Sequence, residues 1–375
     1  MTSTIQSAKL IQDELVSMRR HLHAHPELNF AEHETSKFAA AKLEGFGFDV
    51  RSRGGKTGLV ADFGDGKNII AIRCDMDALP IAELNRSVFT SKNPGVMHAC
   101  GHDAHLACVL GAAQLLSQMS LPGKIRIIVQ PGDDADGKPG AATMIEAGAL
   151  EGVTAILGLH VDGTVPTNKV GIFVSPGLPT VQQFVINIKH TDADEASDTA
   201  LAAANIVRSL YDLPTTSGFD QLSIAVESLH CESSYKAGTG ATIVGRVKTY
   251  KADITQKVQE EIRKIAISAR GNAVVEFQEG PTETVNNATV TAVMHKAAVD
   301  LLGSNNVLSI KRKSWNYQFA MFTEHVPGSM MYLGAEIASS RRSHQSPTFD
   351  IDENCLYVGA AVLAETAVRL MNNGF

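Results

Sequence analysis

Short β-rich runs alternate with helical patterns between about residues 57 and 175, and this alternation constrains the fold of the chain more than any other feature. The expected elements are, in chain order, strands 57–63 and 68–74, helix 101–117, strand 124–130, helix 141–148 and strand 155–160. Strands that alternate with helices predict a sheet with helices on both faces. Ligands of such sheets bind beyond the strand ends, which is where the polar residues of this region gather.

A different order begins at residue 181. The expected elements there are strand 181–189, helix 193–213, strands 221–228 and 241–250, helix 254–270 and strand 273–278. Strand, helix, two strands, helix and strand form the split βαβ arrangement of ferredoxin-like domains, and about 100 residues suffice for a domain of this kind. We therefore expect an α/β protein of two domains. A catalytic domain with a mixed sheet flanked by helices, residues 1–180 and 286–375, is interrupted by an inserted α+β domain, residues 181–285.

Charge and composition exclude several classes of protein. The formal net charge of −7 gives the chain no basic face for phosphates or anionic lipid, which argues against nucleic-acid and membrane partners. The sequence contains no stretch of 18 uninterrupted apolar residues, so no membrane span is expected. The first twenty residues carry Glu14, Arg19 and Arg20 among spaced apolar positions, as in an amphipathic helix and not in a signal peptide. The five cysteines are scattered, at Cys74, Cys100, Cys108, Cys231 and Cys355. An odd, scattered set predicts free thiols and a cytoplasmic location.

The densest group of chemically active side chains is the sequence MHACGHDAH, which runs from Met97 to His105 at a loop that opens the helix 101–117. Thiolate and imidazole are good ligands for zinc, manganese, cobalt or nickel, and a helix N-terminus favours the thiolate form of Cys100. A capped turn with partly exposed histidines would have the same composition. The cysteine, together with acidic loops expected at the same edge of the sheet, favours a metal site.

Acidic residues and His160 lie at other ends of the expected strands, and His344 lies in the segment RRSHQSP at 341–347. Asp133 and Asp134 follow strand 124–130, and adjacent acids can divide the work, one binding a metal and the other taking a proton from water. An exposed acidic loop is the alternative, because residues 136–140 read as a loop. His160 and His344 alone would be expected as hydrogen-bonded histidines, and they become ligand candidates only together with the other residues.

At these positions the sequence resembles the aminoacylase/carboxypeptidase superfamily of metallopeptidases. Within it, the sequence is most similar to the amidohydrolase branch of hippurate hydrolase, indole-acetyl amino-acid hydrolase and N-acetyldiaminopimelate deacetylase. The matching motifs, in chain order, are RHLHAHPE at 20–27, DMDALP at 75–80, HACGHDAH at 98–105, EAGALEG at 146–152, GLH at 158–160, VPG at 326–328 and FDIDE at 349–353. Several long motifs in the same order make a chance similarity very improbable.

Carried over position by position, the resemblance implies a metal centre of one or two divalent ions per chain. Cys100 would bridge two metals, with His102, His160 and Asp134 as further ligands. Asp77 would orient a ligand histidine. The inserted domain would be a lid or dimerisation domain, which implies a homodimer or a higher homo-oligomer.

The resemblance also makes Asp133 the general base, and here the chain departs from the family. Asp133 and Asp134 stand where the family has paired glutamates, so each side chain is shorter by one methylene. A base that is moved back by roughly an ångström can lose orders of magnitude in rate unless the backbone compensates. Activity should therefore depend on how the loop that carries Asp133 is placed.

A second departure lies near the C-terminus. Gln345 stands directly before Ser-Pro, where the family has a ligand histidine, and His344 precedes it by one residue. In an extended segment such a shift turns the side chain to the opposite face, so we expect His344 to be a poor metal ligand and the metal content to fall below two per chain. Gln345 is then a candidate substrate-binding residue.

Two more departures concern substrate binding. Tyr317-Gln318-Phe319 replaces the Glu-Asp-Phe signature of the family, which makes Tyr317 a candidate substrate contact. The motif that supplies an oxyanion-stabilising histidine from the lid is missing. His190 is a weak substitute in that region, and His230 is another.

The expected function is hydrolysis of the amide bond of an N-acyl or N-aroyl amino acid, or of a similar small molecule, by water that the metal and Asp133 activate. Two alternatives stay open: a non-amide hydrolysis, such as removal of an amino group from an activated aromatic ring, and a non-catalytic metal-binding relative. Retention of Cys100, His102, Asp77 and His160, with charge-preserving changes at both acids, favours an enzyme with a diverged site.

Overall fold

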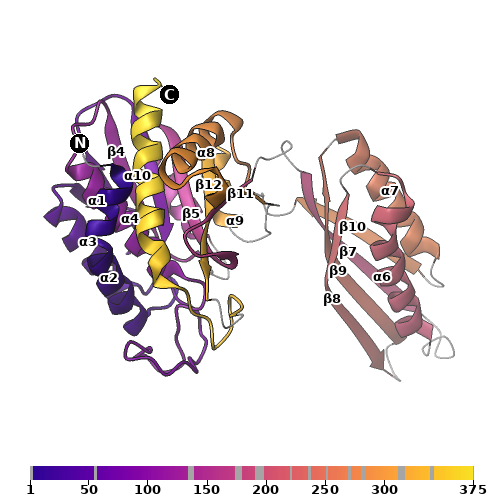
Figure 1. Cartoon of the computed structure of the whole chain (residues 1–375). Coiled ribbons are helices and arrows are strands. Elements are labelled where there is room, and N and C mark those ends of the chain that lie inside the picture. The colour runs from indigo at the N-terminus through magenta and orange to yellow at the C-terminus, as the bar shows by residue number, and fades with distance from the viewer. Residues whose placement is uncertain are drawn as a thin grey trace. The chain divides into compact units, whose positions relative to one another are not determined.

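The computed structural model describes residues 3–54, 57–133, 139–173, 180–190, 198–219, 222–234, 238–250, 252–268, 272–279, 284–310, 317–337 and 342–374. The chain divides into two compact units (Figure 1). Unit 1 comprises Met1–Ser175 and Thr284–Phe375, and unit 2 comprises Pro176–Glu283. These boundaries differ by a few residues from the predicted ranges of 1–180 with 286–375, and of 181–285.

Unit 1 is built on an eight-stranded sheet of order β1-β2-β4-β3-β5-β12-β6-β11. Its strands are β1 Asp49–Ser52, β2 Leu59–Phe63, β3 Ile69–Asp75, β4 Lys124–Gln130, β5 Val153–Pro166, β6 Val170–Ile172, β11 Val307–Ser309 and β12 Gly328–Glu336. The neighbours β4, β3, β5 and β12 run parallel, whereas β1, β2 and β4 pair in antiparallel fashion. The predicted mixed sheet is therefore confirmed. β5 continues six residues beyond His160, where the sequence pattern had placed its end.

Helices cover both faces of this sheet. Those of unit 1 are α1 Thr4–Leu10, α2 Gln12–Ala24, α3 His33–Gly45, α4 His102–Ser117, α5 Gly140–Glu146, α8 Ala288–Leu302, α9 Tyr317–Thr323 and α10 Leu356–Asn372. The larger apolar core joins α1–α4, α8 and α10 to one face, and a smaller cluster joins α5 and α9 to the other. Because β3, β4 and β5 are parallel, their carboxyl ends meet at one edge, and the N-terminus of α4 lies at that edge.

Unit 2 has the predicted split βαβ order. Its elements are β7 Thr180–His190, α6 Asp198–Thr216, β8 Ser223–Ser234, β9 Gly238–Thr249, α7 Ala252–Ser268 and β10 Asn272–Glu279. The sheet has the order β10-β7-β9-β8 and is antiparallel throughout. Inward-facing residues such as Phe184, Ile186 and Ile243 pack with the apolar faces of α6 and α7 in a core of their own.

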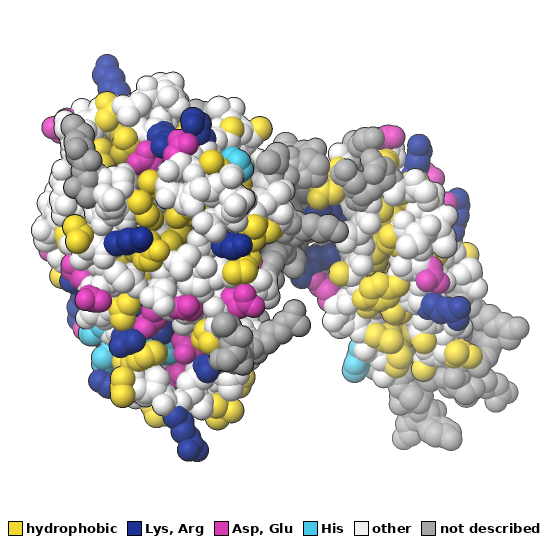
Figure 2. All heavy atoms as spheres, viewed as in Figure 1, with side chains coloured by type: hydrophobic (Ala, Val, Ile, Leu, Met, Phe, Trp, Pro, Cys, Tyr) yellow, Lys and Arg dark blue, Asp and Glu magenta, His cyan; other side chains and the backbone are white. Residues whose placement is uncertain are grey.

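The surface of unit 1 agrees with the modest negative net charge. On the face that Figure 2 shows, basic and acidic side chains are interspersed. Surface ion pairs of unit 1 include Lys37 with Glu34 and Arg369 with Asp300. A surface of mixed sign does not concentrate positive potential for a polyanion.

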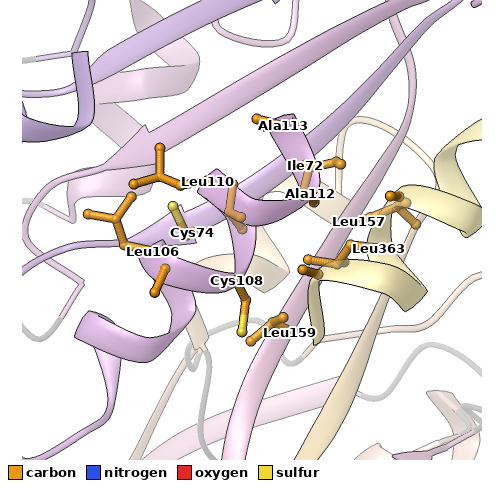
Figure 3. Packing of buried hydrophobic residues seen from close by; sticks show 14 of the residues in the cluster. Ile72, Cys74, Leu106, Cys108, Leu110, Ala112, Ala113, Leu157, Leu159 and Leu363 are labelled. Atoms are coloured by element: carbon orange, nitrogen blue, oxygen red, sulfur yellow. The ribbon is translucent and has the colours of Figure 1, made fainter. Parts of the chain in front are cut away.

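The core between α4, the sheet and α10 holds the functional edge in place. Leu106 and Leu110 of α4 lie near Cys74 of β3, and Leu157 of β5 lies beside Leu363 of α10, all within one buried apolar cluster (Figure 3). Nearly every residue of α4 is buried, so this helix is packed against its neighbours on almost all of its surface. By length and composition alone the segment Glu353–Asn372 could cross a membrane, but 72% of its apolar window is buried inside the protein.

Candidate metal centre

Three metal-ligating side chains converge at the edge where β3, β4 and β5 end. They are Cys100 in the loop before α4, His102 in its first turn and His160 on β5. The Cys100 Sγ atom lies 3.6 Å from His160 Nε2. One potential ligand atom from each of the three residues lies within 4.8 Å of the other two. Both histidines are buried and Cys100 is half-buried, so the group forms the base of a partly sheltered site.

Hydrogen bonds at the opposite ring nitrogens set the tautomer of each histidine. His102 Nδ1 lies 2.9 Å from the carbonyl oxygen of Asp77 and 3.2 Å from Asp77 Oδ1. His160 Nδ1 lies 2.7 Å from the carbonyl oxygen of Val161. Because a carbonyl oxygen only accepts, Nδ1 carries a proton in both rings, and Nε2 is the nitrogen that can serve as a metal ligand. The residues therefore fit a divalent metal, and Asp77 lies where it orients His102.

Gly101 allows Cys100 and His102 to reach the same centre. Its φ is +89°, in the left-handed region that residues with a side chain rarely adopt. A Cβ atom there would also lie 2.3 Å from Cγ2 of Val161. Both the backbone torsion and the packing therefore require glycine at position 101.

A second histidine of the motif is used for support. His105 Nδ1 lies 2.7 Å from Asp75 Oδ1, and the backbone N–H of Val161 donates to His105 Nε2 at 3.0 Å. Asp75, His102 and His105 also lie close enough to hold an ion. Since both nitrogens of His105 are already bonded, we assign this ring to the support of β5 and Asp75 and not to the metal.

The charges around the site favour a cation. Burial lowers the pKa of His160 well below its ordinary value, which keeps the ring neutral, as a metal ligand must be. Burial acts on His102 in the same direction, but the negative charges of Asp75, Cys100 and Asp77 outweigh it and raise the pKa of this ring. The potential that stabilises a proton on His102 would stabilise a metal ion at the same place.

Asp133 lies beside this group, held from the sheet side. Arg73, on β3 and almost fully buried, donates to Asp133 Oδ1 and to Asp75 Oδ2. Gln130 Nε2 donates to the same Asp133 oxygen at 3.0 Å. Burial raises the pKa of Asp133, and the Arg73 guanidinium opposes that shift. Asp134 lies outside the described residues.

The C-terminal segment corrects one expectation. Residues 344 and 345 form a turn and not an extended strand, and Gln345 has a φ of +59°. Its N–H donates to the carbonyl oxygen of Ala99 at 2.8 Å, while its side chain is exposed. The His344 ring lies 5.2 Å from the ring of His160. The alternation of faces on which the prediction for His344 rested does not apply to this turn, and His344 is not among the three residues whose ligand atoms converge. That His344 is a poor metal ligand stays a prediction.

The position of the His344 ring next to His160 argues for the opposite, and on that ground we expect His344→Ala to lower the number of divalent metals bound per chain. Gln345→Ala is the matched control: its exposed side chain should contribute nothing to metal content. Metal analysis of both purified variants after dialysis checks this. Equal metal content in His344→Ala and the wild-type protein would show that the ring only packs against His160 and Phe349, whose ring is 4.6 Å away.

The remaining sequence candidates are placed only in part. His190 is the last residue of β7 and Tyr317 the first of α9, and their side chains lie outside the described parts of the structure. The sequence did not indicate that Arg73, Gln130 and Gln318 bind Asp133, although Gln318 stands in the altered Glu-Asp-Phe signature. A signal was present for Arg73, because a charged residue inside the apolar run of β3 requires a buried partner.

Comparison with known proteins agrees with this geometry. Residues 71–369 match the family model described as Peptidase family M20/M25/M40. N-acetyl-L-cysteine deacetylase of Bacillus subtilis (strain 168) is 31% identical over 97% of this chain and 89% of its own length. IAA-amino acid hydrolase ILR1-like 5 of Arabidopsis thaliana is 32% identical over 96% and 87%, respectively. A Bacillus subtilis crystal structure, described as a dinuclear metal binding peptidase from the M20 family, superposes with a TM-score of 0.81 at 31% identity. That match covers 97% of this chain and 99% of the other.

Proposed function

This chain belongs to peptidase family M20/M25/M40 and is a metal-dependent hydrolase of carbon–nitrogen bonds, and on that premise we propose that it cleaves the amide bond of a small N-acyl or N-aroyl amino acid. The convergence of Cys100 Sγ, His160 Nε2 and one ring nitrogen of His102 carries the proposal. The names of the relatives, which include deacetylases of N-acetylcysteine and hydrolases of IAA-amino acids, support the substrate class.

The metal would be held by Cys100, His102 and His160, with Asp134 and His344 as the further ligands that we propose. Their thiolate, imidazole and carboxylate groups suit zinc, manganese, cobalt or nickel, one or two per chain. When bound, such an ion supplies Lewis acidity, which makes water a stronger nucleophile and polarises the substrate carbonyl.

Asp133 is the proposed general base. It would take a proton from the attacking water, whose oxygen forms a bond to the amide carbon, and pass that proton to the departing nitrogen. The C–N bond breaks and leaves a carboxylic acid and an amine. Two donors already bind Asp133 Oδ1, and among the described residues none donates to Oδ2. The second oxygen is therefore the one that can accept the proton.

The test combines metal analysis with an activity screen. The purified protein should bind divalent metal, lose activity on chelation, and regain it with one of zinc, manganese, cobalt or nickel. N-acetyl, N-benzoyl and indole-acetyl amino acids form the first panel, with release of the free amino acid as the readout. Stoichiometric metal without hydrolysis of any of these amides would contradict the substrate class. Absence of bound metal would contradict the site itself.

We propose that two copies of the chain pair through unit 2 and that the protein works in the cytoplasm. Apolar side chains gather on the visible face of unit 2 (Figure 2). Among its described residues, the exposed large apolar ones are Leu201 and Tyr211 on α6, Leu229 on β8, Ile267 on α7 and Val274 on β10. Exposed apolar groups favour association where they form a contiguous patch. None of the five cysteines forms a disulfide, which is compatible with the proposed reducing compartment.

Joining residues 175 and 284 by a short Gly/Ser linker, which removes unit 2, is expected to give a monomer. Unit 1 has its own sheet and core, so the remaining chain should stay folded. Light scattering of this variant beside the full-length protein measures the two masses. If the shortened chain forms an oligomer with the same number of subunits, the pairing surface lies on unit 1.

A further inference from the structure

The side-chain amide of Gln318, in the first turn of α9, is bonded on both sides to the strand end and loop that carry Asp133. Gln318 Oε1 accepts from Gln130 Nε2 at 2.8 Å and from the N–H of Ala141 at 2.9 Å. Gln318 Nε2 donates to the carbonyl oxygen of Gly132 at 2.9 Å and to that of Asp133. The N–H of Ala141 can only donate and the two carbonyls can only accept, so the orientation of the amide is determined. The side chain is buried, with 8% of the residue exposed.

The same network reaches the carboxylate of Asp133 through Gln130. Gln130 Nε2 donates both to Gln318 Oε1 and to Asp133 Oδ1, while its own Oε1 accepts from Arg73 Nε at 2.9 Å. Gln318 thus holds the backbone of Asp133 directly and its Oδ1 atom through one intermediate. Both side-chain donors, Arg73 and Gln130, bind Oδ1, and within the described part of the chain no donor binds Oδ2.

We propose that Gln318 is a positioning residue that fixes the reach of Asp133. This role rests on the proposed function, in which Asp133 is the base. An aspartate has a short side chain, so the place of its carboxylate follows the place of its backbone. A base must lie within about 3 Å of the proton it takes, and misplacement by about 1 Å can cost on the order of a hundredfold in rate. The rate of hydrolysis should therefore depend on keeping the Gly132–Asp133 backbone in place.

Only an amide satisfies all four bonds at this position. A glutamate would accept from Ala141 and Gln130, but its other oxygen would face the carbonyl oxygens of Gly132 and Asp133, which cannot donate to it. A methionine has a similar shape but would leave buried donors and acceptors unpaired. Gln318→Glu therefore removes only the donating half of the amide, whereas Gln318→Met removes both the donating and the accepting half.

Gln318→Glu and Gln318→Met are expected to lower kcat by about 10- to 100-fold, with KM within about twofold of wild type and metal content unchanged. Asn286→Asp is the matched control. The Asn286 side chain is also a buried amide, donating to the carbonyl oxygens of Phe173 and Met330. Asn286→Asp should lower the melting temperature about as much as the Gln318 substitutions do, but it should leave kcat unchanged.

A double-mutant cycle with Asp133 separates positioning from general destabilisation. In an Asp133→Asn background, Gln318→Glu should lower the residual kcat no further, because the group through which Gln318 acts is already lost. A loss of the same factor in both backgrounds would overturn the role of Gln318. Normal turnover by Asp133→Asn would instead overturn the base assignment in the proposed function. Normal kcat in both Gln318 variants beside an inactive Asp133→Asn would overturn the role of Gln318 alone.

Hydrogen exchange adds a measurement that does not depend on activity. The amide of Ala141 should exchange faster in Gln318→Met, which has lost the acceptor, than in Gln318→Glu, which retains it. Equal exchange of Ala141 in wild type and Gln318→Met would overturn the role of Gln318 in ordering this loop. If Gln318→Glu fails to fold, Gln318→Met carries both measurements.

Discussion

Replacing Cys100 with serine is expected to abolish hydrolysis and to lower the metal content of the protein, while the fold is retained. A serine hydroxyl stays protonated at neutral pH and is a poor ligand for the softer divalent metals, whereas a thiolate binds them well. Cys100 is half-buried and makes no disulfide, so the exchange of sulfur for oxygen should disturb little packing. Metal analysis, amide hydrolysis and far-UV circular dichroism measure the three parts of this result.

Cys231→Ser is the matched control, because Cys231 is an exposed free cysteine on β8 of unit 2. It should keep wild-type metal content and turnover. Full metal occupancy and normal turnover in Cys100→Ser would exclude Cys100 as an essential ligand. The centre would then depend on the two histidines and on carboxylates.

Asp133→Asn is expected to lower kcat at least about a hundredfold, since proton transfer by a positioned base contributes about 10²–10⁴. Asparagine has nearly the same shape but cannot take a proton. Arg73 would keep its ion pair with Asp75, so the strand end should stay ordered. Steady-state kinetics and metal content, measured together, separate loss of the base from loss of the metal.

Two companion variants make the assignment of Asp133 specific. Asp134→Asn should act mainly through metal content, so an inactive Asp134→Asn beside a normal Asp133→Asn would reverse the two roles. Asp133→Glu should crowd the water and lower the rate, because the backbone at Asp133 is already held in place by Gln318. If Asp133→Glu instead hydrolyses N-acyl amino acids faster, the native site is tuned for another reaction. The non-amide hydrolysis would then become the leading assignment.

The order of the elements between residues 57 and 160 and between 181 and 278 could be predicted because it depends on local pattern. Apolar periodicity and turn residues act within a few positions, so strands such as β4 and helices such as α4 were expected within one or two residues of their observed bounds. The same holds for the pair Cys100 and His102. They are two residues apart around Gly101, so any fold that forms this turn brings them together.

Other parts of the site were decided by the tertiary structure alone. The place of His344 depends on the left-handed torsion of Gln345 and its bond to Ala99, which a pattern of alternating faces cannot express. The hold on Asp133 joins Arg73 of β3, Gln130 of β4 and Gln318 of α9. Such contacts link residues up to 188 positions apart and leave no local periodicity. The sequence by itself therefore determined which groups are proposed to perform the chemistry, and the packing of distant segments determined where Asp133, the proposed base, is held.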